Sequence, residues 1–142
     1  MKHLKLLLTI LFLSLYVTSH GQKSQKQIDR EKNRVEIFSD QERANLQLHF
    51  YDKTQEMNLS EDVEEEYYRL LLHYVYDIQR LNDKDKGLTN AEIKVDLEKL
   101  VTKMNSKIQP VLEEADYQTH LNNFNDLLKS IYRKKGWDWD RK

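Results

Sequence analysis

Two series of apolar residues with the same spacing limit the folds that this chain can adopt. Each series steps by +4, +3, +1, +3, +4 and +3 residues, and the second repeats the first 30 residues later. The first series is Val63, Tyr67, Leu70, Leu71, Tyr74, Ile78 and Leu81, and the second is Ile93, Leu97, Leu100, Val101, Met104, Ile108 and Val111. Steps of three and four residues place side chains on one face of an α-helix. Two such helices joined by the short link 82–88 predict an antiparallel helical hairpin at about 61–82 and 89–110.

Start signals stand where the two helices of this hairpin should begin. Ser60 is a good N-cap, and the acidic residues Glu61 and Asp62 suit the positive end of the helix dipole. Thr89 followed by Glu92 has the spacing of a capping box, in which each residue satisfies a backbone N–H group of the other.

Residues typical of helix ends predict one further helix on each side of the hairpin. Ser39 and Glu42 form a second capping-box pattern, which opens a helix that runs to about Met57 and has a thin apolar face. Pro110 interrupts the apolar pattern, and Gly136 is a C-terminal cap for a last helix. We therefore predict an all-α fold, with a long antiparallel hairpin and flanking helices arranged as a four-helix bundle or as a curved helical dimer.

The first residues have the layout of a secretory signal peptide. Lys2 and Lys5 precede an apolar run from Leu6 to Val17, and the run is too short to span a bilayer. Small residues before a cleavage point after Gly21 complete the pattern. We expect a signal peptide at 1–21, a polar N-terminal arm at 22–38, a helical domain at 39–135 and a tail at 136–142, with no membrane span after the signal.

Composition narrows the classes of partner and chemistry. Loss of Lys2 and Lys5 with the signal lowers the formal net charge from −1 to −3, and this balance argues against nucleic acid as a partner. The chain has no cysteine, so an exported form has neither disulfides nor thiol chemistry. We expect a periplasmic protein, with secretion to the exterior as the alternative.

No arrangement of residues in the sequence predicts catalysis or a cofactor. The histidines after the signal, His49, His73 and His120, are not paired at helical metal-ligand spacing, and His73 is expected at the boundary of the core. The acidic run from Glu61 to Glu66 is explained by a solvated helix face, and no phosphate-binding loop or nucleophile motif is present. We predict that the protein is not an enzyme and holds neither a metal nor a cofactor.

Aromatic residues away from the apolar stripes are the candidates for protein binding. Phe50, Tyr68 and Tyr76 fall off the stripes of their helices, and Trp137 and Trp139 stand in a polar tail. Exposed aromatic side chains offer a large contact area at a low cost in conformational entropy. The alternative is that these rings close over the core or over a dimer interface.

Two short segments begin with leucine at points where helices are expected to start: Leu59-Ser60-Glu61-Asp62-Val63, and Leu112-Glu113-Glu114-Ala115-Asp116 with Tyr117 after it. They resemble the repeated Leu-Thr-x-x-Gln signature of the Spy/CpxP-like periplasmic proteins. Ser60 keeps the capping hydroxyl, whereas Val63 and Asp116 replace the glutamine. The resemblance implies a helical dimer that holds unfolded polypeptides without ATP, or an envelope-stress regulator.

Two hypotheses of function follow from these features. In the first, the protein is a binding module that engages unfolded or partner polypeptides through exposed apolar and aromatic side chains. In the second, it is a structural or sensory envelope protein that assembles with itself, or responds to a metal, and binds no client. Because the flanking helices have thinner apolar faces than the hairpin, we expect a homodimer in which Phe50, Tyr68 and Tyr76 are candidate contacts.

Overall fold

The computed structural model describes residues 23–140, which contain α-helices, two short 3₁₀ turns and no strands. The predicted signal peptide at 1–21 and the last two residues of the tail lie outside the described residues. The α-helices are α2 (Gln25–Asn33), α3 (Asp40–Glu56), α4 (Glu61–Arg80), α5 (Asn90–Ile108) and α6 (Glu114–Lys135). The 3₁₀ turns are Lys84–Lys86 and Gln109–Val111. The predicted all-α class is therefore confirmed.

The chain divides after Lys32 into two compact units. Most of α2 belongs to the first unit, where the polar arm is expected, and none of its residues is buried; Ile28 is exposed. An ion pair between Lys23 Nζ and Glu31 Oε2, at 2.8 Å, spans this helix.

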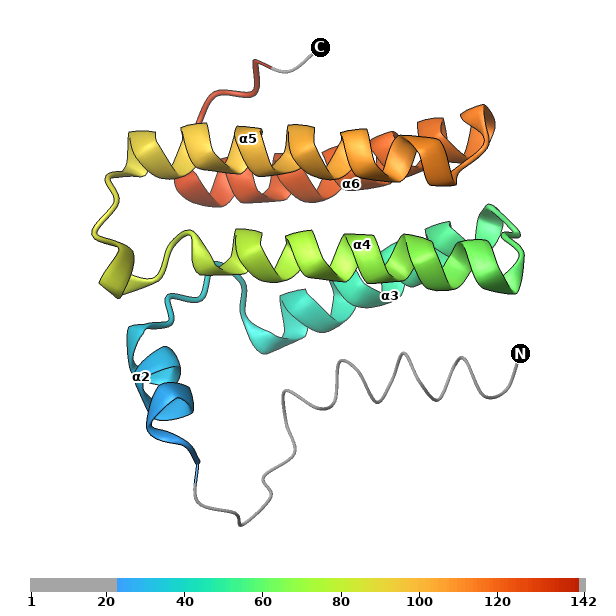
Figure 1. The fold of residues 1–142 in the computed structure, drawn as a ribbon. Helices are drawn as coiled ribbons and strands as arrows, with labels where there is room; N and C mark the ends of the chain where they lie inside the picture. Colours follow the sequence, from blue (N-terminus) through green and yellow to red (C-terminus); the bar gives the residue numbers. More distant parts are fainter. Residues whose placement is uncertain (1–22, 141–142) are drawn as a thin grey trace. The chain divides into compact units, whose positions relative to one another are not determined.

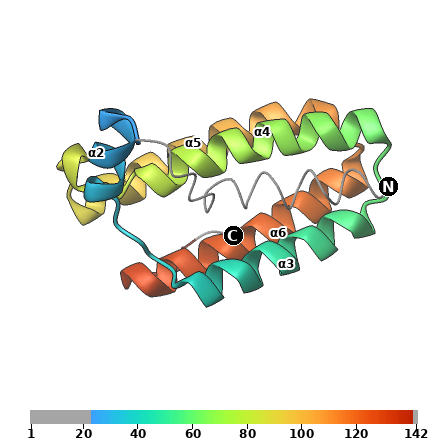
Figure 2. The same ribbon diagram turned by 90° about the horizontal axis from the view of Figure 1, so that it is seen from below.

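In the second unit, α3, α4, α5 and α6 run alternately in opposite directions (Figure 1). The views in Figures 1 and 2 agree that α4 lies along α5 and that α3 lies along α6, so the four helices form two layers. The hairpin of the two apolar series is the pair α4 and α5, and the flanking helices α3 and α6 form the second layer. This arrangement is that of a four-helix bundle.

The core comes mainly from three of the four helices. The buried apolar residues of these helices are Tyr67, Tyr68, Leu71, Tyr74 and Ile78 of α4, Ile93, Leu97, Val101, Met104 and Ile108 of α5, and Phe124, Leu128, Ile131 and Tyr132 of α6. In α3 only Thr54 is buried and Leu48 is exposed, so this helix contributes little to the core and Leu48 does not lie on a buried apolar face. Leu70 and Leu100 are half-buried. Each is the first of two adjacent apolar residues in its series. They lie at the edge of the stripe, where a neighbouring helix covers only part of the side chain.

The predicted capping boxes are both formed. Ser39 Oγ accepts from the Glu42 backbone N–H at 3.3 Å, and Glu42 Oε2 accepts from the Ser39 backbone N–H at 2.9 Å. Thr89 and Glu92 make the same pair of bonds, at 3.3 and 2.8 Å. Ser60 occupies the N-cap position of α4 with no side-chain capping bond. These bonds explain why α3 and α5 begin where the sequence places them.

The ends of the helices also follow the sequence. Gly136 closes α6 with φ at 67°, a left-handed conformation that is costly for residues with a Cβ atom. Pro110 lies in the 3₁₀ turn that follows α5 directly. The proline therefore ends the helix instead of bending a longer one.

Candidate functional site

The structure does not bring the three predicted binding aromatics together on one exposed surface. Tyr68 is only 7% exposed, so the expectation that it projects from the helical domain is wrong. Phe50 is half-buried and packs edge-on against Phe124, with ring centroids 6.3 Å apart. Tyr76 is 39% exposed, and its hydroxyl oxygen lies 3.5 Å from the Arg80 guanidinium. The alternative prediction, that these rings close over the core, holds for Tyr68 and Phe50 but not for Tyr76.

Burial raises the pKa of the Tyr68 phenol. Desolvation is the main cause that raises the pKa of its phenol to about 12, so the ring stays neutral at any physiological pH. Its hydroxyl group has no hydrogen-bond partner among the described residues. An adjacent helix shields this side chain although it lies off the apolar stripe of α4, and the stripe pattern alone does not show that.

Other apolar side chains are more exposed than the predicted ones. Leu48 of α3 is 62% exposed and Val95 of α5 is 53% exposed. Val95 was not predicted because it stands alone between polar residues on the outer side of its helix. The sequence indicated Val95 only as an isolated β-branched residue on a polar helix face.

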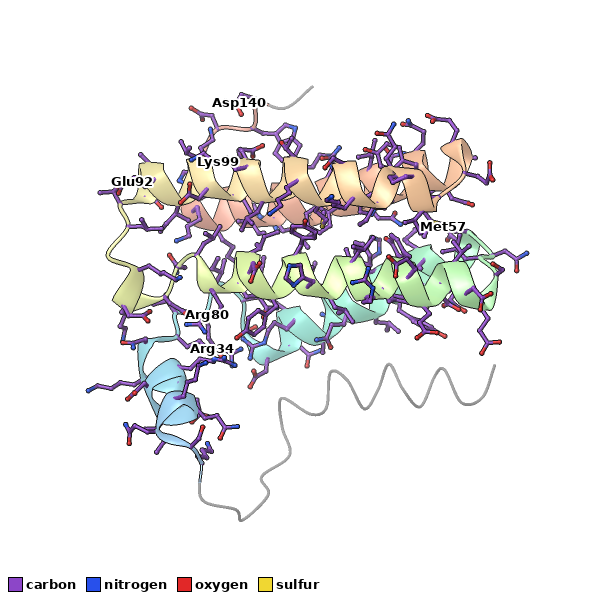
Figure 3. The ribbon with its side chains drawn as sticks, in the orientation of Figure 1. Arg34, Met57, Arg80, Glu92, Lys99 and Asp140 are labelled. Carbon is purple, nitrogen blue, oxygen red and sulfur yellow. The ribbon has the colours of Figure 1, made fainter. Side chains whose placement is uncertain are left out.

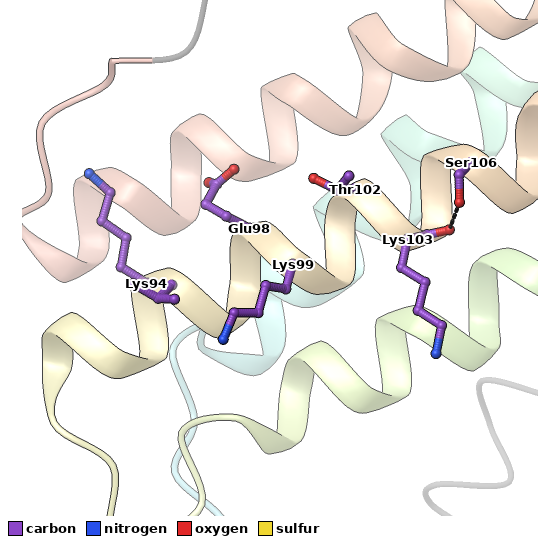
Figure 4. A pocket seen from close by; sticks show the side chains of 7 residues that line it. Lys94, Glu98, Lys99, Thr102, Lys103 and Ser106 are labelled. Carbon is purple, nitrogen blue, oxygen red and sulfur yellow. Dashed lines mark hydrogen bonds between the residues drawn. The ribbon is translucent and has the colours of Figure 1, made fainter.

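Val95 lies in a groove along the outer side of α5, which we call the α5 groove (Figure 4). The groove has a volume of about 610 Å³. Its lining residues are Lys94, Val95, Glu98, Lys99, Thr102, Lys103 and Ser106. All of them come from one helix at steps of one or three residues, so the groove is an open strip and not an enclosed chamber. A site that buries most of a small molecule needs walls from several elements, whereas an open strip suits a polypeptide segment.

The charges of the α5 groove are mostly positive. Lys99 Nζ lies 2.9 Å from Asp96 Oδ1, and Lys94 Nζ lies 3.4 Å from Asp140 Oδ2 in the tail. Lys103 makes no ion pair within the described part of the chain. The one acidic side chain of the lining, Glu98, accepts a hydrogen bond from the Tyr132 hydroxyl. The groove is thus a basic strip on a chain whose formal net charge is −1.

The described tail packs against the helices next to this groove. The rings of Trp137 and Trp139 meet the ring of Tyr132 edge-on, with centroids 5.3 and 5.1 Å away. Lys129 Nζ lies 5.7 Å from the centroid of Trp139. Figure 3 shows Asp140 above the first turns of α5, where it meets Lys94. The tail has no helical periodicity, yet aromatic contacts hold it in place.

A buried histidine forms a polar contact inside the bundle that the sequence analysis missed. His120 is fully buried in α6, its Nδ1 lies 3.0 Å from the Tyr67 hydroxyl, and its Nε2 lies 3.1 Å from Asn105 Oδ1. A neutral ring that accepts from Tyr67 and donates to Asn105 satisfies both contacts. Burial lowers the pKa of His120 to about 4, so this neutral form persists at physiological pH.

The His120 contacts connect α4, α5 and α6, because Tyr67, Asn105 and His120 come from these three helices in turn. The flanking rings of Tyr117 and Phe124 cover the imidazole, with centroids 6.1 and 6.0 Å away. The signal in the sequence was the position of His120 between the apolar residues Tyr117, Leu121 and Phe124, which follow one another at helical spacing. His73, expected at the boundary of the core, is instead exposed and lies 3.8 Å from Asp77.

Residues 23–140 contain neither a cluster of metal-binding side chains nor a membrane-spanning helix. There, no three or more His, Cys, Asp or Glu side chains are grouped so that they could hold a metal ion. No helix in the same range is long and apolar enough to cross a membrane. Comparison with known proteins gives no match to a family model, a curated protein or a solved structure.

Proposed function

We propose that this protein is an exported helical binding protein, without catalytic activity, that engages other polypeptides. The observation that carries the proposal is the α5 groove, where the exposed side chain of Val95 lies among lysines on a bundle whose core is already filled. Because Val95 is 53% exposed, another molecule can cover its side chain.

The chemistry of the groove favours a polypeptide over a small substrate. Lysine side chains present apolar methylene stems beside Val95 and keep their ammonium groups at the edge, so the strip combines apolar contact with charge. Interfaces between proteins have this composition, with an apolar centre and a polar rim.

The position of His120, the histidine whose pKa is lowered by burial, supports a role without catalysis. General acid–base catalysis requires a titratable group within reach of a substrate. His120 is instead enclosed by Tyr67, Tyr117 and Phe124, and both of its ring nitrogens have partners within the bundle. His120 therefore helps to fix how the helices pack against one another.

The specific form that we propose is a chaperone that works without ATP in the periplasm and holds unfolded polypeptides. The segments around Leu59-Ser60 and Leu112, which resemble those of Spy/CpxP-like proteins, support this form. In the structure, the first segment leads into α4 and the second leads into α6. The resemblance therefore concerns corresponding positions at the starts of two helices.

Suppression of aggregation tests the proposal. Insulin reduced by dithiothreitol is a suitable client, because this chain has no cysteine and the reductant does not alter it. We expect excess protein to lower the light scattering of aggregating insulin and Val95→Asp to lose most of this effect. Ile28→Asp, at an exposed position of α2, is the matched control. Unchanged scattering at severalfold excess of the wild-type protein would reject the chaperone function.

Self-association is a second candidate, and the exposure of Leu48 favours it. This leucine lies on α3, the helix that contributes least to the core, and it is the most exposed large apolar residue among those described. A second copy that covers Leu48 and Tyr76 would form the homodimer expected from the sequence, without Tyr68. Sedimentation across a hundredfold range of concentration should show a dimer that Leu48→Asp dissociates. A single monomeric species throughout would rule the dimer out.

A further inference from the structure

The turn between α3 and α4 contains a sequence pattern that the proposed function does not use. Asn58-Leu59-Ser60 has the form Asn-x-Ser, in which the middle residue is not proline. This form is the acceptor for N-linked glycans in exported proteins. Asn58 is the only asparagine of the sequence with a serine or threonine two positions later. The chain therefore has a single candidate acceptor.

The structure presents this asparagine outside the helices and open to solvent. α3 ends at Glu56 and α4 begins at Glu61, and the turn between them lies at one end of the bundle (Figures 1 and 2). Asn58 is exposed, whereas its neighbour Met57 is only 8% exposed and fixes the turn to the core. Glycan acceptors lie in surface loops, because a transferase must reach the side-chain amide. Asn58 meets this requirement.

The backbone of the turn is held by few hydrogen bonds. Asn58 has φ at 49° and is the only non-glycine residue with positive φ within residues 23–140. Asparagine adopts this left-handed conformation more readily than most residues. In the same range, segment 58–60 donates a single hydrogen bond from its backbone, from the Asn58 N–H to the Gln55 carbonyl oxygen at 3.2 Å. An enzyme can therefore draw Asn58 and Leu59 into its own site while α3 and α4 keep their helical hydrogen bonds.

The hydroxyl group that the pattern requires is also available. Ser60 is exposed and occupies the N-cap position of α4, but its side chain makes no capping hydrogen bond. Ser39 and Thr89, at the equivalent positions of α3 and α5, both make one. The Ser60 hydroxyl can thus donate to and accept from groups of a transferase.

An acidic side chain precedes the acceptor. Glu56 stands two positions before Asn58 and is exposed, and its Oε1 lies 2.7 Å from Lys53 Nζ on the surface. Bacterial transferases that act in the periplasm require an acidic residue at this position in addition to the Asn-x-Ser pattern. Segment 56–60 therefore suits the compartment predicted from the signal sequence.

We propose that Asn58 is a site of N-linked glycosylation, with an oligosaccharide joined to a lipid through pyrophosphate as the donor. The side-chain nitrogen of Asn58 forms a bond to the first sugar carbon, while the bond from that carbon to the pyrophosphate oxygen breaks. The lipid pyrophosphate leaves with the electron pair of the broken bond, and the amide nitrogen gives one proton to a base of the transferase. This inference uses the predicted export and does not depend on polypeptide binding.

Transfer of a glycan to the purified, folded protein tests the site. The probe is a purified bacterial oligosaccharyltransferase with its lipid-pyrophosphate-linked oligosaccharide, and the readout is the intact mass followed by peptide mapping. We expect a gain of the mass of one glycan, located on the peptide that contains Asn58. Asn58→Gln should abolish the gain. Asn90→Gln, at another exposed asparagine, is the matched control and should leave the gain unchanged.

Substitutions of Ser60 test the role of the hydroxyl group and leave the acceptor in place. Ser60→Ala should remove most of the modification, and Ser60→Thr, which keeps a hydroxyl group, should retain it. Because Ser60 makes no capping bond, both variants should keep the thermal unfolding temperature of the wild-type protein, measured by circular dichroism.

A synthetic peptide with the sequence of residues 52–64 separates the sequence pattern from its setting in the fold. Modification of this peptide without modification of the folded protein would show that the turn does not present Asn58, and no modification of either would show that the segment is not an acceptor. Both results would overturn the proposal, and so would transfer that persists in Asn58→Gln or Ser60→Ala. The aggregation of insulin is measured without the transferase, so failure of this site and failure of the proposed function are distinguishable.

Discussion

The buried imidazole of His120 should make the stability of this protein depend on pH above the range in which carboxyl groups titrate. The ordinary histidine pKa of 6.5 falls to about 4 in the folded protein because of burial. Between these values the unfolded chain binds a proton that the folded chain does not, so the free energy of unfolding falls as the pH falls. The contribution is fully present above the unfolded pKa and is lost as the pH drops through the folded one.

The size of this effect follows from the two pKa values. Each pKa unit corresponds to about 1.4 kcal/mol, so lowering the pH from 7.5 to 4 should remove about 3 kcal/mol of unfolding free energy through His120. That loss is a large share of the stability of an ordinary small domain, which is about 5–15 kcal/mol. The structural cause is an imidazole that has Tyr67 and Asn105 as hydrogen-bond partners and no carboxylate to stabilise its charged form.

Urea unfolding followed by circular dichroism at several pH values measures this contribution. His120→Gln removes the titrating ring and keeps an acceptor and a donor for the neighbouring hydroxyl and amide. Its absolute stability at neutral pH is expected to be lower, so the comparison is between slopes against pH. Wild-type protein should lose about 3 kcal/mol more than the variant between pH 7.5 and 4.

His49→Gln provides the control, since His49 is an exposed histidine and its replacement should leave the wild-type slope unchanged. Glu42 adds a dependence at lower pH, because hydrogen bonds from Lys134 and Ser39 lower its pKa from 4.5 to about 2. The stabilising contribution of Glu42 is lost as the pH falls below 4.5, after most of the His120 effect is complete. Parallel curves for wild-type protein and His120→Gln would refute the assignment of the higher window to His120.

Two further pairs of substitutions test the fold by urea unfolding. Leu71→Ala should cost about 2 to 5 kcal/mol because Leu71 is buried, and Leu100→Ala should cost clearly less because Leu100 is half-buried; equal costs would contradict these positions. Ser39→Ala should cost about 1 kcal/mol through the lost bond to the Glu42 backbone, whereas Ser60→Ala should cost little because Ser60 makes no capping bond. A larger loss at Ser60 than at Ser39 would contradict the cap geometry.

The helices and their ends could be predicted because the causes are local. The steps of three and four residues from Val63 and from Ile93 define α4 and α5, and the Ser39 and Thr89 boxes begin α3 and α5 where expected. Gly136 ends α6 for a similarly local reason, since glycine adopts the left-handed conformation at little cost.

The candidate site was less predictable, because exposure depends on the helices that pack nearby. The stripe of α4 shows which side chains face α5, but it does not show that Tyr68 is also covered. In the same way, periodicity identifies Val95 only as a residue outside the stripe of α5. Whether such a residue is covered or exposed is decided by the position of other elements.

The sequence by itself therefore determined the secondary structure and the pairing of two long amphipathic helices, since turns, caps and apolar spacing act within a few residues. Only the tertiary structure decided that Tyr67, Asn105 and His120 share one polar contact in the core, and that the tail seats its tryptophans on Tyr132 beside the α5 groove. These contacts join residues distant in the chain, and their free energy depends on burial and geometry that exist only after the helices have packed.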